Sequence, residues 1–381
     1  MKRLLKLVAI ATVAAAWNPF GRRKAQDATT TTTTTPGTCD ASDEACAAAA
    51  AEADALERLA ALERAASVPA GAGRPSTAPQ KWISVAVSAN GSRRVALASG
   101  GTFANDFKGA GLWTSRDGGA TWQQKARDGN WRSVASDAAG DRLLACGAGR
   151  APGELWRSRD AGETWAAVAG GPSGFWDGAA SSADGSALAA VDGANPGRLW
   201  LSRDAGDTWA PVAGDHFRRE SRVSLKAAAL SADGSTIAVA LWGGHPATSD
   251  DGGRTWITST APALQWSAVA VSSDGSTMAL AAYGGGVWTS ADAGATWAER
   301  APSGEARSWI AVACDGTCAT IAAASSALLG DSTIWLSRDG GATWADLGIP
   351  DKWTGLALSA DGAQLAAVAK DATAPHHTPL A

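Results

Sequence analysis

The polar residues that most clearly could serve a chemical role belong to one motif, Ser-x-Asp-x-Gly-x-Thr-Trp, which occurs six times. We call this motif the box. Each copy places a carboxylate between two hydroxyl groups. An Asp in a tight turn accepts hydrogen bonds from nearby backbone amides, and the Gly at position five suits a positive φ. The sequence therefore predicts a structural role for the box. Its aspartates are Asp117, Asp160, Asp204, Asp251, Asp292 and Asp339.

The remaining polar residues do not form a recognisable catalytic set. A glycosidase of the two-carboxylate type needs a facing acid pair in a cleft, and most Asp residues here are used in turns. The other acids, such as Asp106, Asp177 and Asp192, follow no pairing. None of the four His residues falls in a Ser-His-Asp pattern. The sequence thus favours a protein without catalytic activity.

The cysteines are placed for disulfides rather than for metal. Cys39 and Cys46 form one close pair, Cys314 and Cys318 form a second, and Cys146 is alone. If residues 1–16 are a signal peptide, as expected below, such close pairs fit an oxidising compartment. Neither pair has the second half of a zinc site. We therefore expect two disulfides, no metal and no cofactor.

One irregular insertion between the repeats is rich in arginine. Arg218, Arg219 and Arg222 lie shortly before Leu225, which replaces the Trp that opens most repeats. A solvated basic loop is the plain interpretation. The functional one is a docking patch, because the planar guanidinium group binds carboxylates of an acidic partner in a bidentate fashion.

A second motif alternates with the box and indicates the elements that must position it. Trp82 to Ser88 alternates like a strand and leads into Asn90-Gly91, which is a strong hairpin signal. Related segments begin at Trp131, Trp176, Leu225, Trp266, Trp309 and Trp353. Each period of 41 to 47 residues thus holds two hairpins. Four short strands per period match one propeller blade.

The whole repeat region therefore predicts an all-β fold, a single β-propeller over residues 81–370. Seven first hairpins but six boxes predict seven blades with an incomplete last blade, and six blades with a surplus hairpin is the alternative. The repeat also explains the composition. Of 19 Trp residues, all but Trp17 and Trp242 occupy a repeated position.

The remaining segments do not belong to the propeller. We expect a signal peptide or presequence (1–16), a disordered Thr-rich segment (17–41), a short Ala-rich helix (42–67), a linker (68–80) and a disordered tail (371–381). The first apolar run is too short for a confident membrane span, although an uncleaved anchor is the alternative. A formal net charge of −4 disfavours nucleic acid as a partner.

The six boxes resemble the Asp-box, or BNR, repeats of the sialidase-like propeller superfamily over residues 82–369. Blade length and the Trp-x-x-Val-Ala strand look most like the photosystem II stability and assembly factors. Active sialidases use a Tyr nucleophile and an Arg-Ile-Pro motif; this chain has one Tyr, Tyr283, and no Arg-Ile-Pro. Xyloglucan-acting relatives place their cleft between two propellers, and this chain has room for one.

The resemblance implies a non-catalytic, monomeric scaffold that binds protein or glycan, either like a photosystem II assembly factor or as a secreted repeat protein. A glycoside hydrolase of the same superfamily is the alternative. The leader implies the secretory pathway, with an extracellular or cell-surface location. The residues Ala-Ala-Trp17-Asn-Pro-Phe20 resemble the junction of a bipartite plastid presequence and offer the thylakoid lumen as the alternative.

Overall fold

A computed structural model describes most of the repeat region. The described residues are 80–99, 111–127, 130–147, 152–194, 197–212, 223–300, 307–326, 332–372 and 374–380. The predicted leader segments before residue 80 lie outside them, as do Cys39, Cys46, Arg218, Arg219 and Arg222. In the part of the chain that is described, no helix has the length and hydropathy needed to cross a membrane.

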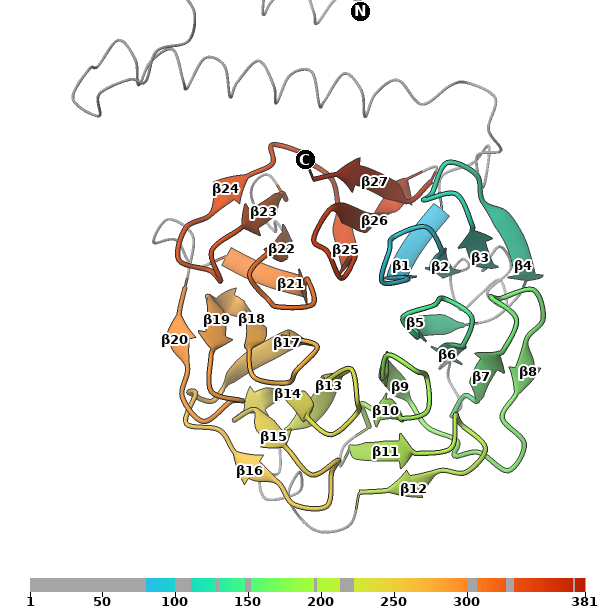
Figure 1. Cartoon of the computed structure of the whole chain (residues 1–381), viewed down its shortest axis with the longest axis horizontal. Helices are drawn as coiled ribbons and strands as arrows, with labels where there is room; N and C mark the ends of the chain where they lie inside the picture. The colour runs from blue at the N-terminus through green and yellow to red at the C-terminus, as the bar shows by residue number, and fades with distance from the viewer. Residues whose placement is uncertain are drawn as a thin grey trace, which may run out of the picture. The chain divides into compact units, whose positions relative to one another are not determined.

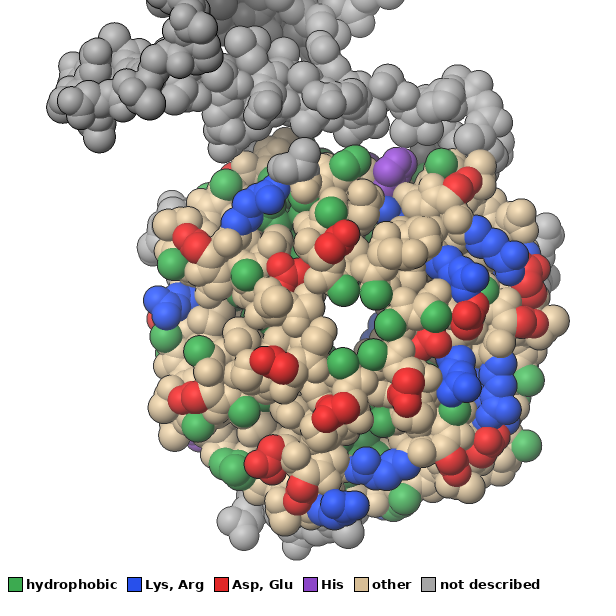
Figure 2. Space-filling view, viewed as in Figure 1, with side chains coloured by type: hydrophobic (Ala, Val, Ile, Leu, Met, Phe, Trp, Pro, Cys, Tyr) green, Lys and Arg blue, Asp and Glu red, His purple; other side chains and the backbone are tan. Residues whose placement is uncertain are grey.

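The described chain forms seven antiparallel blades around a central hole (Figures 1 and 2), and strand pairing joins blade 7 to blade 1, blade 4 to blade 5 and blade 5 to blade 6. Blades 1 and 2 comprise β1 (Gln80–Val87), β2 (Arg94–Ser99), β3 (Gly111–Ser115), β4 (Gln123–Arg127), β5 (Trp131–Ser136), β6 (Leu143–Gly147), β7 (Leu155–Ser158) and β8 (Ala166–Ala167). Blades 3 and 4 comprise β9 (Trp176–Ser181), β10 (Leu188–Asp192), β11 (Arg198–Ser202), β12 (Ala210–Pro211), β13 (Ser224–Leu230), β14 (Ile237–Gly244), β15 (Ala247–Ser249) and β16 (Ile257–Thr258). Blades 5 and 6 comprise β17 (Leu264–Val271), β18 (Met278–Gly285), β19 (Val287–Ser290), β20 (Ala298–Glu299), β21 (Arg307–Cys314), β22 (Ile321–Ser326), β23 (Ile334–Ser337) and β24 (Ala345–Asp346).

Blade 7 has three strands among the described residues: β25 (Trp353–Leu358), β26 (Gln364–Ala372) and β27 (His376–Pro379). The prediction of a disordered tail after residue 370 is therefore wrong. Residues 376 and 377 pair with Ala367 and Ala366. His376 takes the position that Trp occupies two residues before a box, and its ring contacts Trp353 edge-on at 5.0 Å. The imidazole thus fills the site of the missing indole, which sequence periodicity based on Trp could not detect.

The two faces of the propeller differ because strand direction alternates within each blade. The turn face carries the turn of each first hairpin and the boxes. The loop face carries the connections from second to third strands and from one blade to the next. Figure 1 views the ring along its axis, with β1, β5, β9, β13, β17, β21 and β25 innermost.

A closed ring of backbone hydrogen bonds joins the seven first-hairpin turns on the turn face. In each turn one amide donates to a carbonyl oxygen of the next blade at 2.7 to 2.9 Å, and the seventh donates back to the first. The residues are Ala89, Ala138, Ala183, Ala232, Ser273, Gly316 and Ala360. Seven equivalent turns in one cycle confirm the prediction of seven blades.

The core lies between neighbouring blades rather than at the centre of the ring. Trp82, Trp176, Trp266 and Trp309 are completely buried there. Several opening Trp residues meet the Trp of the third strand edge-on, as Trp82 and Trp113 do at 6.1 Å between ring centres. Such edge-to-face pairs add about 1 kcal/mol to the burial of apolar area. The repeated Trp residues thus hold the blades together, and Trp242 is the one described Trp outside this scheme.

Candidate binding site on the loop face

The box aspartates are occupied by their own turns. In blade 2, the Asp160 carboxylate accepts hydrogen bonds from Ser158 Oγ at 2.8 Å and from the Thr164 amide at 2.9 Å. The Thr164 hydroxyl donates to the second carboxylate oxygen. These bonds recur in all six boxes.

The same bonds fix the charge state of the box. The side chain and then the backbone amide of Thr164 lower the pKa of Asp160 to about 2, because both donate to its charged form. The pKa values of Asp204 and Asp339 are lowered to about 2 in the same way. A carboxylate held this strongly as an anion is a poor general acid at neutral pH. The geometry therefore gives these residues a turn-stabilising role.

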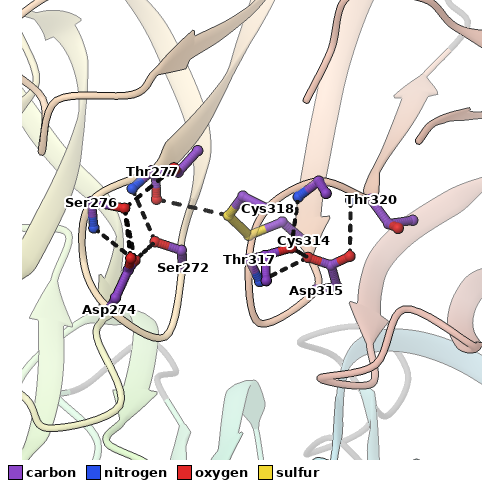
Figure 3. Close-up of a disulfide and its surroundings, with 10 residues drawn as sticks. Ser272, Asp274, Ser276, Thr277, Cys314, Asp315, Thr317, Cys318 and Thr320 are labelled. Carbon is purple, nitrogen blue, oxygen red and sulfur yellow. Dashed lines mark hydrogen bonds between the residues drawn. A yellow bond between two sulfur atoms is a disulfide. The ribbon is translucent and has the colours of Figure 1, made fainter. Parts of the chain in front are cut away.

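The Cys314–Cys318 disulfide also belongs to a turn (Figure 3). It brackets the first-hairpin turn of blade 6, where Cys318 takes the position of the glycine found in the other six first-hairpin turns. Cys318 accordingly has a φ of 55°. The Asp315 carboxylate accepts hydrogen bonds from Thr317 and Thr320 in the same turn. The free thiol, Cys146, is fully buried, and burial raises its pKa to about 12.

On the loop face, residues that break the repeat come together. Trp242 lies two residues before the end of β14, the second strand of blade 4, and Tyr283 has the corresponding position in β18 of blade 5. Their rings are 5.6 Å apart with planes tilted by 39°. Both are half-buried, and neither belongs to a core cluster. An aromatic pair that fills no core is available to a ligand.

An ion triad adjoins this aromatic pair. Asp177, on the innermost strand of blade 3, binds Arg132 of blade 2 at 3.2 Å and Lys226 of blade 4 at 2.7 Å. Its carboxylate is only 15% exposed, whereas Arg132 is 53% exposed. The Lys226 ammonium group also lies 5.9 Å from the ring centre of Trp242. Two cations share one carboxylate, so the triad carries a net positive charge, and its Lys226 lies next to the Trp242 ring.

Topology places these groups on one side of the ring. Arg132, Asp177 and Lys226 each follow the opening residue of an innermost strand, and Ser224 pairs with Trp242 in the same register. In the other blades this position holds Ile83, Ser267, Ile310 and Thr354. The site was not predicted from the sequence, although charge at this one position in three consecutive blades was a usable signal.

The cluster can bind but is not arranged for an obvious reaction. Asp177 is engaged by two cations, and Asp192, which caps its own loop through the amides of Phe175 and Ala194, belongs to the same blade. Among the described residues, no group of three or more His, Cys, Asp or Glu side chains could hold a metal ion. Arg218, Arg219 and Arg222 precede β13, but their placement lies outside the described residues.

Comparison with known proteins supports the fold. No protein-family model matches the chain, and no curated protein matches it in sequence. Similar solved structures include the GH74 enzyme of Niastella koreensis, with a TM-score of 0.61 and 16% identity over 78% of this chain. YCF48 from Cyanidioschyzon merolae has a TM-score of 0.60 and 15% identity over 80% of this chain. YCF48 bound to D1 peptide has a TM-score of 0.57 and 16% identity over 81%.

These likenesses establish a β-propeller and leave its role open. The match covers 52% of the GH74 enzyme, so this chain spans about half of that protein. It covers 98% and 95% of the two YCF48 chains. The neighbours therefore include both enzymes and a propeller that binds a peptide.

Proposed function

We propose that this protein is a non-catalytic propeller scaffold that binds a polypeptide segment on its loop face. The observation that carries the proposal is the cluster of Lys226, Trp242 and Tyr283. These residues break the repeat, lie outside the core and combine aromatic surface with positive charge. The aromatic rings bury apolar side chains of the partner, and the cations receive its backbone carbonyl or carboxylate oxygens.

Two further observations support a scaffold. The box carboxylates, which are the most repeated reactive groups, are held as anions by their own turns. YCF48, one of the structural neighbours matched over almost its whole length, was solved with a D1 peptide bound. By extension, the partner in this proposal is a segment of another protein. The most specific version of the proposal is a role as an assembly factor.

Affinity capture from the native organism tests the proposal. Wild-type protein is compared with a Lys226→Ala/Trp242→Ala variant, and with Asp160→Ala as a control for lost stability on the other face. We expect a partner that is retained by wild type and by Asp160→Ala, and is depleted at least about tenfold by the loop-face variant. An identical set of captured proteins for all three would contradict a binding site at the cluster.

A hydrolase is the alternative, favoured by the GH74 neighbours. Purified protein incubated with β-glucans and sialosides distinguishes the two. The scaffold proposal expects no turnover. Turnover that a single substitution such as Asp177→Asn abolishes would establish the enzyme instead.

The compartment forms part of the proposal. An oxidising compartment reached through a signal peptide agrees with the Cys314–Cys318 bond. A fluorescent fusion to the full chain separates the secretory route from the plastid route. Signal at the cell surface would contradict a role in photosystem assembly.

A further inference from the structure

The turn face holds a row of ion pairs between neighbouring boxes. Arg116, at position two of box 1, binds Glu163, at position six of box 2, at 2.9 Å. One blade further, Arg159 binds Asp207 at 2.9 Å through the same two positions. The arginine of one box thus reaches the acid of the next.

We call the contact between the boxes of two neighbouring blades a seam. In both of these seams the acidic side chain binds two cations of the preceding blade. Glu163 also binds Lys125 at 2.7 Å, and Asp207 also binds Arg157 at 2.7 Å. These neighbours lower the pKa of Glu163 and of Asp207, with the hydrogen bonds of Lys125 and of Arg157 contributing most. One carboxylate between two cations is therefore the rule in the seams of blades 1 to 3.

The next seam breaks this rule. Box 3 supplies Arg203 at position two, but position six of box 4 is Arg254. A methyl group added to Gly252 would lie 2.5 and 2.6 Å from the terminal nitrogens of Arg203, so this guanidinium rests on box 4. Both arginines are exposed, and neither has an ion pair with a carboxylate of the described chain. Figure 2 shows Lys and Arg side chains at the rim near β11 and β12, with acidic side chains beside them.

We infer that Arg203 and Arg254 form a carboxylate-binding site that an acidic side chain of a partner protein fills from outside. Asp251, the nearest carboxylate in sequence, is bonded to its own turn through the amides of Arg254 and Thr255 and through the Thr255 hydroxyl. The side chains of Arg203 and Arg254 thus meet the same box without a salt bridge, and an external carboxylate can supply one. The seams of blades 1 to 3 show that a single carboxylate accepts two cations at such a contact, although both cations there come from the preceding blade, whereas Arg203 and Arg254 come from two blades. The site lies on the opposite face from Lys226 and does not depend on the function proposed for the loop face.

The test measures binding of a short fluorescein-labelled peptide of alternating Glu and Gly to the full chain at low salt, by anisotropy. A peptide with Gln for Glu is the control ligand. Arg254→Glu restores an internal ion pair with Arg203 and should weaken binding about tenfold without lowering Tm. Arg159→Ala, which removes an arginine that is already paired, should leave binding within about twofold.

The converse substitution gives an independent readout. Asp207→Arg breaks the row one seam earlier, and we expect the protein to bind a second copy of the Glu peptide. Trp242→Ala should bind the peptide like wild type, which separates this site from the loop-face cluster. Unchanged binding by a folded Arg254→Glu protein, or equal binding of the Gln peptide, overturns the inference. Displacement of the peptide by inorganic phosphate at lower concentrations than acetate overturns the carboxylate assignment.

Discussion

The two faces of this propeller follow different rules. On the turn face, the backbone amides of the first-hairpin turns and the box carboxylates have the same partners in every blade that carries them, as the seven-membered hydrogen-bond ring and the six boxes show. On the loop face, equivalent positions carry different residues. The backbones of Trp242 and Tyr283 pair with the next blade in the same register, but the side chains of Lys226, Trp242 and Tyr283 belong to no repeated contact. The difference teaches that repetition marks stability here, whereas a break in the repeat marks a place where a ligand can be recognised.

The largest expected effect compares two glycines with the same backbone conformation on the two faces. Gly234, in the turn-face ring of turns, has a φ of 70°, and an added methyl would lie 2.5 Å from the Ala187 side chain. Gly284, on the loop face, has a φ of 72° and no atom within 4 Å of that methyl. Gly234→Ala should cost about 3 kcal/mol, from backbone strain and overpacking. Gly284→Ala should cost only about 0.5 kcal/mol, because the lower flexibility of the unfolded chain offsets part of the backbone strain.

Equilibrium urea unfolding of both variants measures this difference. The comparison is internally controlled because both substitutions add the same methyl group to a left-handed residue. Equal losses of stability would mean that the turn-face ring is not packed more tightly than the loops.

The next effect concerns carboxylates. Asp160→Ala removes the acceptor of Ser158 Oγ and of both Thr164 donors. Because Asp160 and Thr164 are exposed and only Ser158 is buried, we expect a loss of about 1 kcal/mol. Asp160→Asn keeps one acceptor oxygen and should lose about half as much. Neither variant should change binding of a captured partner. Lost binding with an unchanged free energy of unfolding would assign the box a direct functional role.

Acid should weaken the turn face before it affects the aromatic pair of the loop face. The pKa of Asp160, Asp204 and Asp339 is about 2 in the folded protein, against an ordinary value of 3.8. A depressed pKa stabilises the fold above the unfolded value, and this contribution is lost as pH falls from about 4 through 2. Thermal unfolding followed from pH 6 to pH 2 should show Tm falling mainly below about pH 4. A flat Tm across that range would contradict the role assigned to these hydrogen bonds.

The parts of the fold that follow the sequence repeat could be predicted from the sequence. Asn90-Gly91 and the box turns gave the hairpins, and the Trp spacing gave the blades, because both depend on local sequence. β27 was missed because His376 substitutes for Trp and Pro379 ends the strand, so neither residue matches the pattern. Local sequence also did not show that Ala360 and Ala89 close the ring of hydrogen bonds between the first-hairpin turns. These residues lie in the last and first blades and meet only when the propeller closes.

The candidate site was less predictable. The expected patch at Arg218, Arg219 and Arg222 is still a prediction. The cluster that the structure brings together, Arg132, Asp177 and Lys226, comes from three blades, and its members are 45 and 49 residues apart. The available signal was that all three residues are charged and hold the same position of consecutive repeats. It is weak because this position has no consensus residue in the other blades.

The smallest effect tests whether the box is optimal as it stands. Ala205, at position four of box 3, has a φ of 55°, where boxes 1, 4 and 6 have glycine. Ala205→Gly should relieve the left-handed strain and raise the free energy of unfolding by about 0.5 kcal/mol, since the added flexibility of the unfolded chain offsets part of the gain. On the loop face, Gly170 has a φ of 66° and open space around it, so Gly170→Ala should give a similar change of opposite sign. If Ala205→Gly destabilises the protein instead, the cause lies in the neighbouring blade, where Arg157 donates to the Ala205 carbonyl at 3.3 Å. In that case the restricted backbone of Ala205 would hold its carbonyl oxygen in place for the Arg157 hydrogen bond. The strained alanine would then stabilise the turn face more than a glycine could.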